Sequence, residues 1–221
     1  MHIEPGIVAG AKIVLSYATA ANAGLYSLKL AFGALRDRGL TALAARTGLA
    51  TAATFVFFQV LPTAPVGVSE VHLILGSTLF LLFGAAPAAI GLALGLLIQG
   101  LAFAPADLPQ YGMNVTTLLV PLFAVAALAR RIIAPGTAYV DLSYAQALAL
   151  STAFQGGIVA WVAFWAFYGQ GAEAWGGIAA FGAAYLLVIA LEPLVDLAVL
   201  AGAKSLRGLR GSALVTPRLF A

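Results

Sequence analysis

Two histidines are the side chains of this chain best suited to hold a transition-metal ion. Neutral imidazole is the commonest metal ligand among protein side chains. His2 offers more than its ring, because a free amine on Met1, the amide nitrogen of His2 and its ring Nδ1 can all bind one ion. Amine and amide close one chelate ring, and amide and Nδ1 close a second. The three nitrogens then lie nearly in a plane, and His72 is the remaining imidazole that could complete a square.

The geometry of such a site favours particular ions. Square-planar nitrogen ligation suits Cu(II) or Ni(II), and Co(II) lies just below nickel in affinity order. The site requires that Met1 is retained, which we expect because the bulky second residue hinders removal of the initiator. The alternative interpretation makes His2 a disordered terminal residue and His72 an interfacial one.

The composition indicates that these residues lie in an integral membrane protein. The chain has 221 residues, of which 9% are charged and 62% are hydrophobic, whereas an ordinary soluble domain is about 25% charged. A water-soluble fold of this size could not cover its surface with so few polar groups. Soluble enzymes, disordered proteins and nucleic-acid-binding domains are therefore excluded. The chain contains no cysteine, so disulfides and thiolate metal sites are excluded as well.

Seven apolar stretches qualify as membrane-spanning helices, which need roughly 20 mostly apolar residues. They cover residues 9–35, 41–61, 69–83, 85–103, 114–133, 143–168 and 177–200. Turn-forming prolines and glycines separate most of them. No signal peptide is expected, since residues 1–6 lack a basic region followed by an apolar core. The sequence predicts an all-α integral membrane protein, a bundle of seven transmembrane helices.

Charge sets the predicted orientation and separates the third and fourth stretches. Residues 71–103 could form one very long helix, and residues 84–87 (Gly-Ala-Ala-Pro) are the candidate turn. With a turn there, nearly all Lys and Arg residues collect on one side, which is typical of cytoplasmic loops. The opposite side then holds both histidines and the acidic residues Glu4, Glu70, Asp107 and Glu173. We therefore expect the N-terminus outside and the C-terminus in the cytoplasm, with the basic residues contacting anionic lipids and no nucleic acid.

The third stretch is short for a spanning helix. Its roughly 15 residues give about 22 Å, against a hydrocarbon core of about 30 Å, so its outer end at His72 should lie below the membrane surface. Backbone at that depth must pack in protein or face a cavity. We expect the loop 62–70 to dip into the bundle and line a pocket open to the outside. The chain is predicted as one transmembrane domain, 1–221, with a metal-binding segment 1–8, a pocket loop 62–72 and a basic cytoplasmic tail 203–221.

Two motifs resemble a known family. Residues 1–6, Met-His-Ile-Glu-Pro-Gly, resemble the Met-His-Ile-x-x-Gly start of the CbiM/NikM proteins, the substrate-binding (S) components of cobalt and nickel energy-coupling-factor (ECF) transporters. Residues 69–76, Ser-Glu-Val-His-Leu-Ile-Leu-Gly, resemble their Ser-x-x-His-Leu-x-x-Gly motif. The segments 97–99 and 112–114 are also similar to family positions, and the hydrophobic layout agrees over essentially the whole chain.

The resemblance implies a ligand set, partners and a location. Met1 (through its amine), His2 and His72 would hold the ion, and Ser69, Glu70 and Asn114 would shape the pocket or support the ligands. The cargo would be Co²⁺, since the match is most like CbiM, or else Ni²⁺, with no prosthetic group. The partners would be a transmembrane coupling (T) subunit, ATP-binding subunits and a small accessory membrane subunit. Such an ABC-type importer would lie in the bacterial inner membrane and serve cobalamin biosynthesis.

The last predicted helix departs from the family pattern. Family members commonly carry a histidine near a proline there, and this chain has Leu191-Glu192-Pro193 instead. Glu192 and Asp196 lie on one face of that helix, and acidic residues inside a bilayer usually face a cavity or a partner. We expect them to make structural or partner contacts rather than to bind the metal.

Three functions are weighed against these features: a metal-capturing subunit with separate ATPases, a self-sufficient ion-coupled carrier, and an intramembrane hydrolase. The chain has no G-x-x-x-x-G-K-[ST] loop, so any ATP use must come from partners. An ion-coupled carrier favours several buried carboxylates and an internal repeat, of which the sequence shows two carboxylates and no repeat. A hydrolase would use Ser69 or Ser77 with His72, which leaves His2 unexplained. We therefore expect a transporter subunit and not an enzyme.

Overall fold

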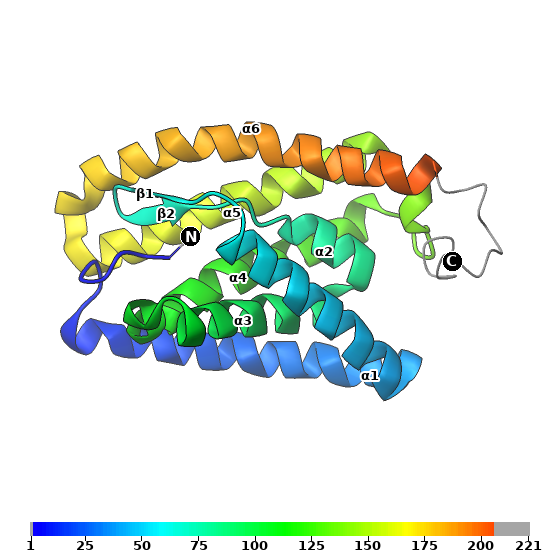
Figure 1. The fold of residues 1–221 in the computed structure, drawn as a ribbon, viewed down its shortest axis with the longest axis horizontal. Coiled ribbons are helices and arrows are strands. Elements are labelled where there is room, and N and C mark those ends of the chain that lie inside the picture. The colour runs from blue at the N-terminus through cyan, green and yellow to red at the C-terminus, as the bar shows by residue number, and fades with distance from the viewer. Residues whose placement is uncertain (1, 206–221) are drawn as a thin grey trace.

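The structure, a computed structural model, describes residues 2–205 and is a bundle of long helices with one small hairpin (Figure 1). The helices are α1 (Ile13–Gln59), α2 (Gly76–Phe83), α3 (Ala85–Ala102), α4 (Tyr111–Ile132), α5 (Tyr144–Gln170) and α6 (Trp175–Ser205). The strands β1 (Ala64–Val66) and β2 (Ser69–Val71) pair antiparallel. Short 3₁₀ turns cover Gly10–Lys12, Pro105–Gln110, Tyr139–Asp141 and Gly171–Ala174.

Helix α1 is two helices joined by a sharp turn. Gly39 has a φ of 78° and a ψ of 169°, a conformation that glycine adopts without the steric penalty of a side chain. The chain therefore reverses between residues 13–38 and residues 40–59, which form the two arms seen at the lower right of Figure 1. This turn falls between the first two predicted stretches.

The predicted third span is wrong in its first half. Residues 69–71 form β2 and not helix, and α2 begins only at Gly76. With eight residues, α2 is about 12 Å long, too short to cross a hydrocarbon core of about 30 Å. The predicted turn after it is confirmed, because Gly84, with a φ of 92°, separates α2 from α3.

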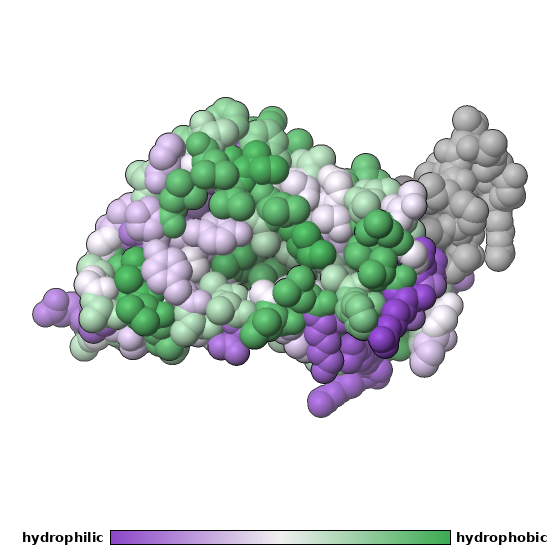
Figure 2. Space-filling view, turned by 90° about the horizontal axis from the view of Figure 1, so that it is seen from below, coloured by the Kyte–Doolittle hydropathy of each residue, from purple (hydrophilic) through white to green (hydrophobic). Residues whose placement is uncertain are grey.

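The long helices have the composition of membrane spans. Four helical segments of the described chain are long and apolar enough to cross a membrane: 10–59, 85–102, 105–132 and 144–205. Hydrophobic side chains cover most of the face shown in Figure 2, and strongly hydrophilic ones gather mainly at one end. The protein is therefore mostly helical and has the spans of a membrane protein. The expectation of an all-α fold is wrong at the hairpin, because β1 and β2 pair antiparallel.

Small residues let the helices of the bundle pack closely. A β-carbon on Gly91 of α3 would lie 2.5 Å from Cβ of Ala50, and one on Gly95 would lie 2.7 Å from Cβ of Thr54. Helix α3 therefore packs against the second arm of α1 with backbones in close approach, as is common between membrane helices. This packing, together with the buried helix α4, forms the core of the bundle. The hairpin lies against α6, where a β-carbon on Gly177 would come within 2.8 Å of Cγ1 of Val68.

Candidate metal site

The N-terminal segment pairs with the hairpin through a single isolated bridge. Ile3 forms an antiparallel bridge with Ser69, and the amide of Glu70 donates to the carbonyl of His2 at 3.0 Å. The Ser69 hydroxyl donates to the same carbonyl at 3.0 Å. These bonds fix the backbone of His2 beside β2, although the two segments are far apart in the sequence.

Helices α4 and α5 also hold the N-terminal segment in place. Ile3 is 1% exposed and packs with Met113 of α4 and Trp165 of α5, which are both fully buried. Gly169 allows the segment to lie directly on α5, since a β-carbon there would come within 2.0 Å of the carbonyl oxygen of Ile7. The burial of these apolar side chains favours the closed position of the segment.

Asn114 connects the segment to α4 by a buried hydrogen bond. Its Oδ1 accepts from the amide of Ile3 at 2.8 Å, and the side chain is 2% exposed. Asn114 therefore holds the residue next to His2, and its side chain supports the site through the backbone.

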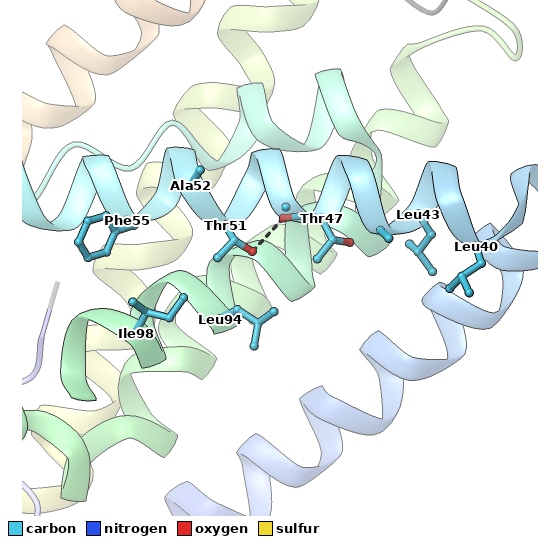
Figure 3. A pocket seen from close by; sticks show the side chains of 10 residues that line it. Leu40, Leu43, Thr47, Thr51, Ala52, Phe55, Leu94 and Ile98 are labelled. Carbon is cyan, nitrogen blue, oxygen red and sulfur yellow. Dashed lines mark hydrogen bonds between the residues drawn. The ribbon is translucent and has the colours of Figure 1, made fainter. Parts of the chain in front are cut away.

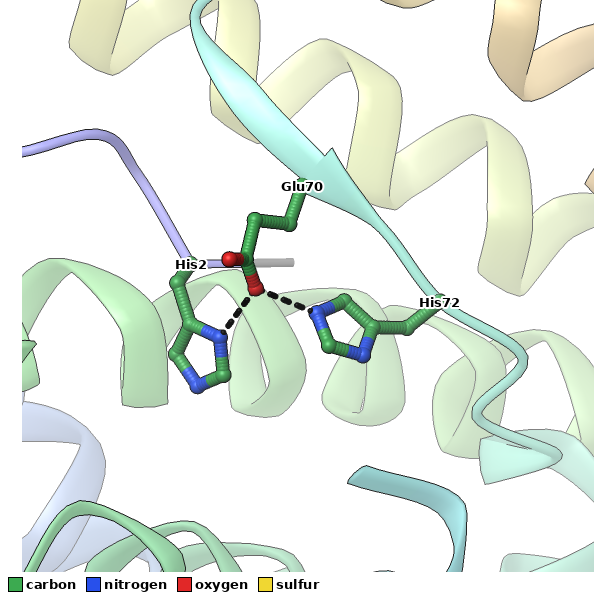
Figure 4. A group of neighbouring side chains, drawn as sticks. All are labelled: His2, Glu70 and His72. Atoms are coloured by element: carbon green, nitrogen blue, oxygen red, sulfur yellow. Dashed lines mark hydrogen bonds and ion pairs between the residues drawn. The ribbon is translucent and has the colours of Figure 1, made fainter. Parts of the chain in front are cut away.

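Three side chains of the types that ligate metals, His2, Glu70 and His72, meet where the segment crosses β2; they are called the metal-ligating group below. Nδ1 of His2 and Nε2 of His72 each lie 2.8 Å from Oε2 of Glu70, and one ligand atom from each residue lies within 4.8 Å of the others. Figure 4 shows both rings turned toward the Glu70 carboxylate. Both histidines are almost fully buried, at 3% and 2% exposed, whereas the Glu70 side chain is 29% exposed, so the compact donor set meets solvent on its Glu70 side.

The imidazole N–H protons of His2 and His72 that face Glu70 lie on the nitrogens that an ion would bind. A carboxylate oxygen accepts hydrogen bonds, so the two ring nitrogens that face Glu70 act as donors to it. A divalent ion would bind the same nitrogens after displacing these protons. The imidazole nitrogen of His2 that faces the site is Nδ1, the atom that a chelate with the His2 amide requires.

Acidic groups surround the donor set. The hydrogen bond from His2 lowers the pKa of Glu70, against the opposing effect of its partial burial. Burial raises the pKa of Glu4, and the charges of Glu70 and Asp107 raise it further. Oδ2 of Asp107 lies 3.9 Å from Nδ1 of His2. Three carboxylates therefore lie close together here, and their negative charge suits a divalent cation.

An aromatic ring closes the other side of the two histidines. The ring of Phe58, at the end of α1, lies 5.7 Å from that of His2 and 5.1 Å from that of His72, measured between centroids. The two imidazole centroids are 5.1 Å apart. Phe58 therefore restricts the directions that the rings can take and excludes water from their apolar faces.

The structure brings most of the predicted site residues together. His2, His72 and Glu70 meet, and Ser69 and Asn114 hold the segment that carries His2. Met1 and most of the basic tail 203–221 lie outside the described residues. The loop 62–70 was expected to dip into the bundle and line a pocket open to the outside. Residues 62–65 are instead exposed, and the end of the loop, at Ser69 and Glu70, reaches the site.

Two neighbours of the site were not assigned to it from the sequence. Asp107 was recognised only as an acidic residue on the same side of the membrane, and Phe58 as part of an apolar stretch. Nothing in their spacing relates them to residue 2, since both contacts come from helix ends that meet only in the fold.

The two serines considered for a hydrolase make other bonds. The Ser69 hydroxyl donates to the His2 carbonyl, and the Ser77 hydroxyl donates to Asp196 at 2.7 Å. His72 instead bonds Glu70 through its Nε2. The serine–histidine pair that a nucleophilic mechanism needs is therefore not formed among these residues.

An open pocket of about 760 Å³ lies along the second arm of α1 and α3 (Figure 3). Its lining consists of Leu40, Leu43, Ala44, Thr47, Gly48, Thr51, Ala52, Phe55, Leu94 and Ile98. Among the described residues that line it there is no histidine or carboxylate, so its chemistry differs from that of the metal-ligating group.

Comparison with known proteins identifies the fold and the family of the chain. Two solved structures share the fold, one described as a transition metal transporter and one as a truncated transition metal transporter. Each has a TM-score of 0.67 and 18% sequence identity. The match to the transition metal transporter covers 97% of this chain and 96% of that chain. The match to the truncated transporter covers 93% of this chain and 97% of that chain. None of the curated proteins compared with the chain matches it. The family described as "Cobalt uptake substrate-specific transmembrane region" matches residues 2–208, and the chain therefore belongs to this family, CbiM.

Proposed function

We propose that this chain captures a divalent transition-metal ion, Co²⁺ in the first place, as the S component of an ECF-type importer. The observation that carries the proposal is the convergence of His2 Nδ1 and His72 Nε2 on one point beside β2. Two imidazoles from segments so distant in sequence, buried and facing each other, are a donor pair that first-row metals prefer. Membership of the cobalt-uptake family supports the same cargo.

The terminal nitrogens complete the proposed ligand set. In a chain that starts at Met1, its amine and the His2 amide would join His2 Nδ1 in a planar chelate, and His72 Nε2 would be the fourth donor. Square nitrogen geometry also suits Ni(II), so nickel is the second candidate cargo. Glu70 keeps the two imidazoles turned toward each other before the ion arrives and takes part in neutralising its charge.

We further propose seven helical segments across the membrane, with the segment 72–83 acting as an incomplete third crossing. Most arginines lie at the end of the bundle that holds the Gly39 turn and the end of α4, and four of the eight acidic residues lie at the end that holds the hairpin (Figure 1). These four are Glu4, Glu70, Asp107 and Glu173. Cytoplasmic ends of membrane proteins collect Lys and Arg. The metal-ligating group then faces the outside, and the C-terminus faces the cytoplasm of a bacterial inner membrane.

Energy for transport would come from other subunits. The 221 residues contain no phosphate-binding loop of the G-x-x-x-x-G-K-[ST] type. The proposed partners are a transmembrane coupling subunit, ATP-binding subunits and a small accessory membrane subunit, which together would reorient the loaded protein and release the ion inside, for cobalamin biosynthesis. A self-sufficient ion-coupled permease is the alternative, and reconstitution separates the two.

The direct test of the proposal is isothermal titration of the purified chain with Co²⁺ and Ni²⁺. The wild-type chain should bind one ion, and His72→Ala should weaken binding strongly because a rigid site becomes a flexible terminal chelate. Leu148→Ala, which alters an exposed side chain near the start of α5, is the control and should bind normally. Equal affinity of His72→Ala and the wild type would remove His72 from the site and refute the proposed ligand set.

A further inference from the structure

The link between His72 and α2 has an unusual backbone. It consists of residues 72–75, and Leu75 has a φ of 52° and a ψ of 33°. A left-handed conformation is sterically unfavourable for a residue with a side chain, so it persists only where the surroundings hold it. The structure contains a group that holds it.

Glu192 of α6 binds this link from the far side of the bundle. Its Oε2 accepts from the amide of Ile74 at 2.7 Å, and its Oε1 accepts from the amide of Leu75 at 2.8 Å. The side-chain amide of Gln155, on α5, donates to the same Oε1. Glu192 is 0% exposed. The carboxylate therefore satisfies two backbone donors at the start of α2 that no helical bond could satisfy.

The amide of Ile74, which donates to Glu192, lies two residues after His72. Any change in the position of the Glu192 carboxylate therefore moves the backbone that carries the His72 ring. On the other side, the hairpin fixes the backbone at Val71, which pairs with Ala64. His72 is thus held between two fixed points, and one of them belongs to α6.

We propose that Glu192 is a positioning residue for His72, which sets the metal affinity of the site from α6 without contacting the ion. This inference rests on the proposed function, because it assigns a support to one of the proposed ligands. Without the two bonds, the strained link at Leu75 relaxes and the His72 ring leaves its position opposite His2. Groups that orient a metal ligand commonly matter for affinity nearly as much as the ligand does.

Asp196, one turn further along α6, provides a matched comparison. It is also buried, at 3% exposed, but it accepts from the hydroxyls of Ser77 and Thr78. A hydroxyl can donate or accept, whereas a backbone amide can only donate. Asparagine at 196 can therefore keep bonds to both hydroxyls. Glutamine at 192 offers one acceptor oxygen in place of two, and its own amide would face a backbone donor.

The test compares Co²⁺ titrations of Glu192→Gln and Asp196→Asn in the full-length chain. We expect Glu192→Gln to weaken binding at least about tenfold, the effect of losing one charge-assisted hydrogen bond, and Asp196→Asn to bind with nearly wild-type affinity. Melting temperatures of the metal-free proteins are measured in parallel. An unchanged affinity of Glu192→Gln, at any melting temperature, would overturn the inference.

A double-mutant cycle distinguishes positioning of His72 from general support of the fold. In the His72→Ala background the remaining ligands still chelate the ion weakly, and there Glu192→Gln should leave the residual affinity unchanged. An equal loss in both backgrounds would mean that Glu192 does not act through His72. If Glu192→Gln does not fold, Gln155→Leu, which removes one donor from the same carboxylate, replaces it in the cycle with a smaller expected loss.

The outcomes for the two proposals differ. If the wild-type chain does not bind the ion, or if His72→Ala binds as well as the wild type, the proposed function fails. If the wild type binds, His72→Ala loses affinity and Glu192→Gln does not, only the role of Glu192 fails.

Discussion

Asn114→Ala is expected to weaken metal binding although Asn114 is not a proposed ligand. The change removes the acceptor of the buried amide of Ile3, a bond of 2.8 Å. A buried donor left without a partner costs about 1–3 kcal/mol, whereas water satisfies the same amide when the segment is open. The closed segment is therefore disfavoured by that amount. Since only the closed segment places His2 beside His72, affinity should fall with the closed fraction, by up to roughly 5- to 150-fold.

Two measurements check this reasoning. Isothermal titration with Co²⁺ gives the affinity, and hydrogen exchange of the metal-free protein gives the opening of the segment, which should be faster at the amide of Ile3. Thr117→Val is the control, because the Thr117 hydroxyl is buried on the same helix but bonds only to the carbonyl of Met113. Faster exchange with an unchanged affinity would refute the link between closure of the segment and ion capture.

Three other predictions concern the termini, the pH and the partners. In a chain that starts at Met1, an N-terminal tag should abolish tight binding of Co²⁺ because it converts the amine to an amide. His2→Ala should be at least as damaging, and a C-terminal tag should be harmless. Equal Co²⁺ affinity of the N-terminally tagged and untagged proteins would remove the amine from the ligand set. Binding should weaken as the pH falls from about 7 to about 5, since imidazole binds metals only when neutral. The lowered pKa of Glu70 keeps its carboxylate ionised in mild acid, so the loss of affinity would come from the imidazoles. A pH-independent affinity would contradict imidazole ligation. In proteoliposomes the chain alone should bind the ion without ATP-stimulated uptake, and addition of coupling and ATP-binding subunits should produce uptake; ATP hydrolysis by the isolated chain would refute the assignment.

The helical part of the fold could be predicted because its signals are local. Long apolar stretches and the glycines between them lie within one segment each, and the turns at Gly39 and Gly84 fall where the sequence places them. The pair His2 and His72 could be proposed because the chain has two histidines in all. Their types and their common side of the membrane were enough to suggest one site.

The third span could not be predicted correctly because its structure depends on distant residues. Residues 69–75 are apolar enough to continue the helix, yet β2 pairs with β1 and with Ile3, and the start of α2 is fixed by Glu192, 118 residues from Ile74. The periodicity of apolar residues in one segment cannot predict contacts with distant segments. The same holds for Glu70, whose position between two imidazoles follows from the pairing of the first residues with the hairpin.

The pairing of the N-terminal segment with the hairpin has a consequence for biosynthesis. Residues 2–8 are among the first of this sequence to leave the ribosome, but their neighbours Ser69 and Trp165 are synthesised much later. The segment can therefore reach its final place only after α5 has been made and inserted. A nascent chain stopped before α5 would carry both histidines and still lack the surface on which Ile3 rests. Tight retention of the ion during translation would thus mark the completion of the bundle.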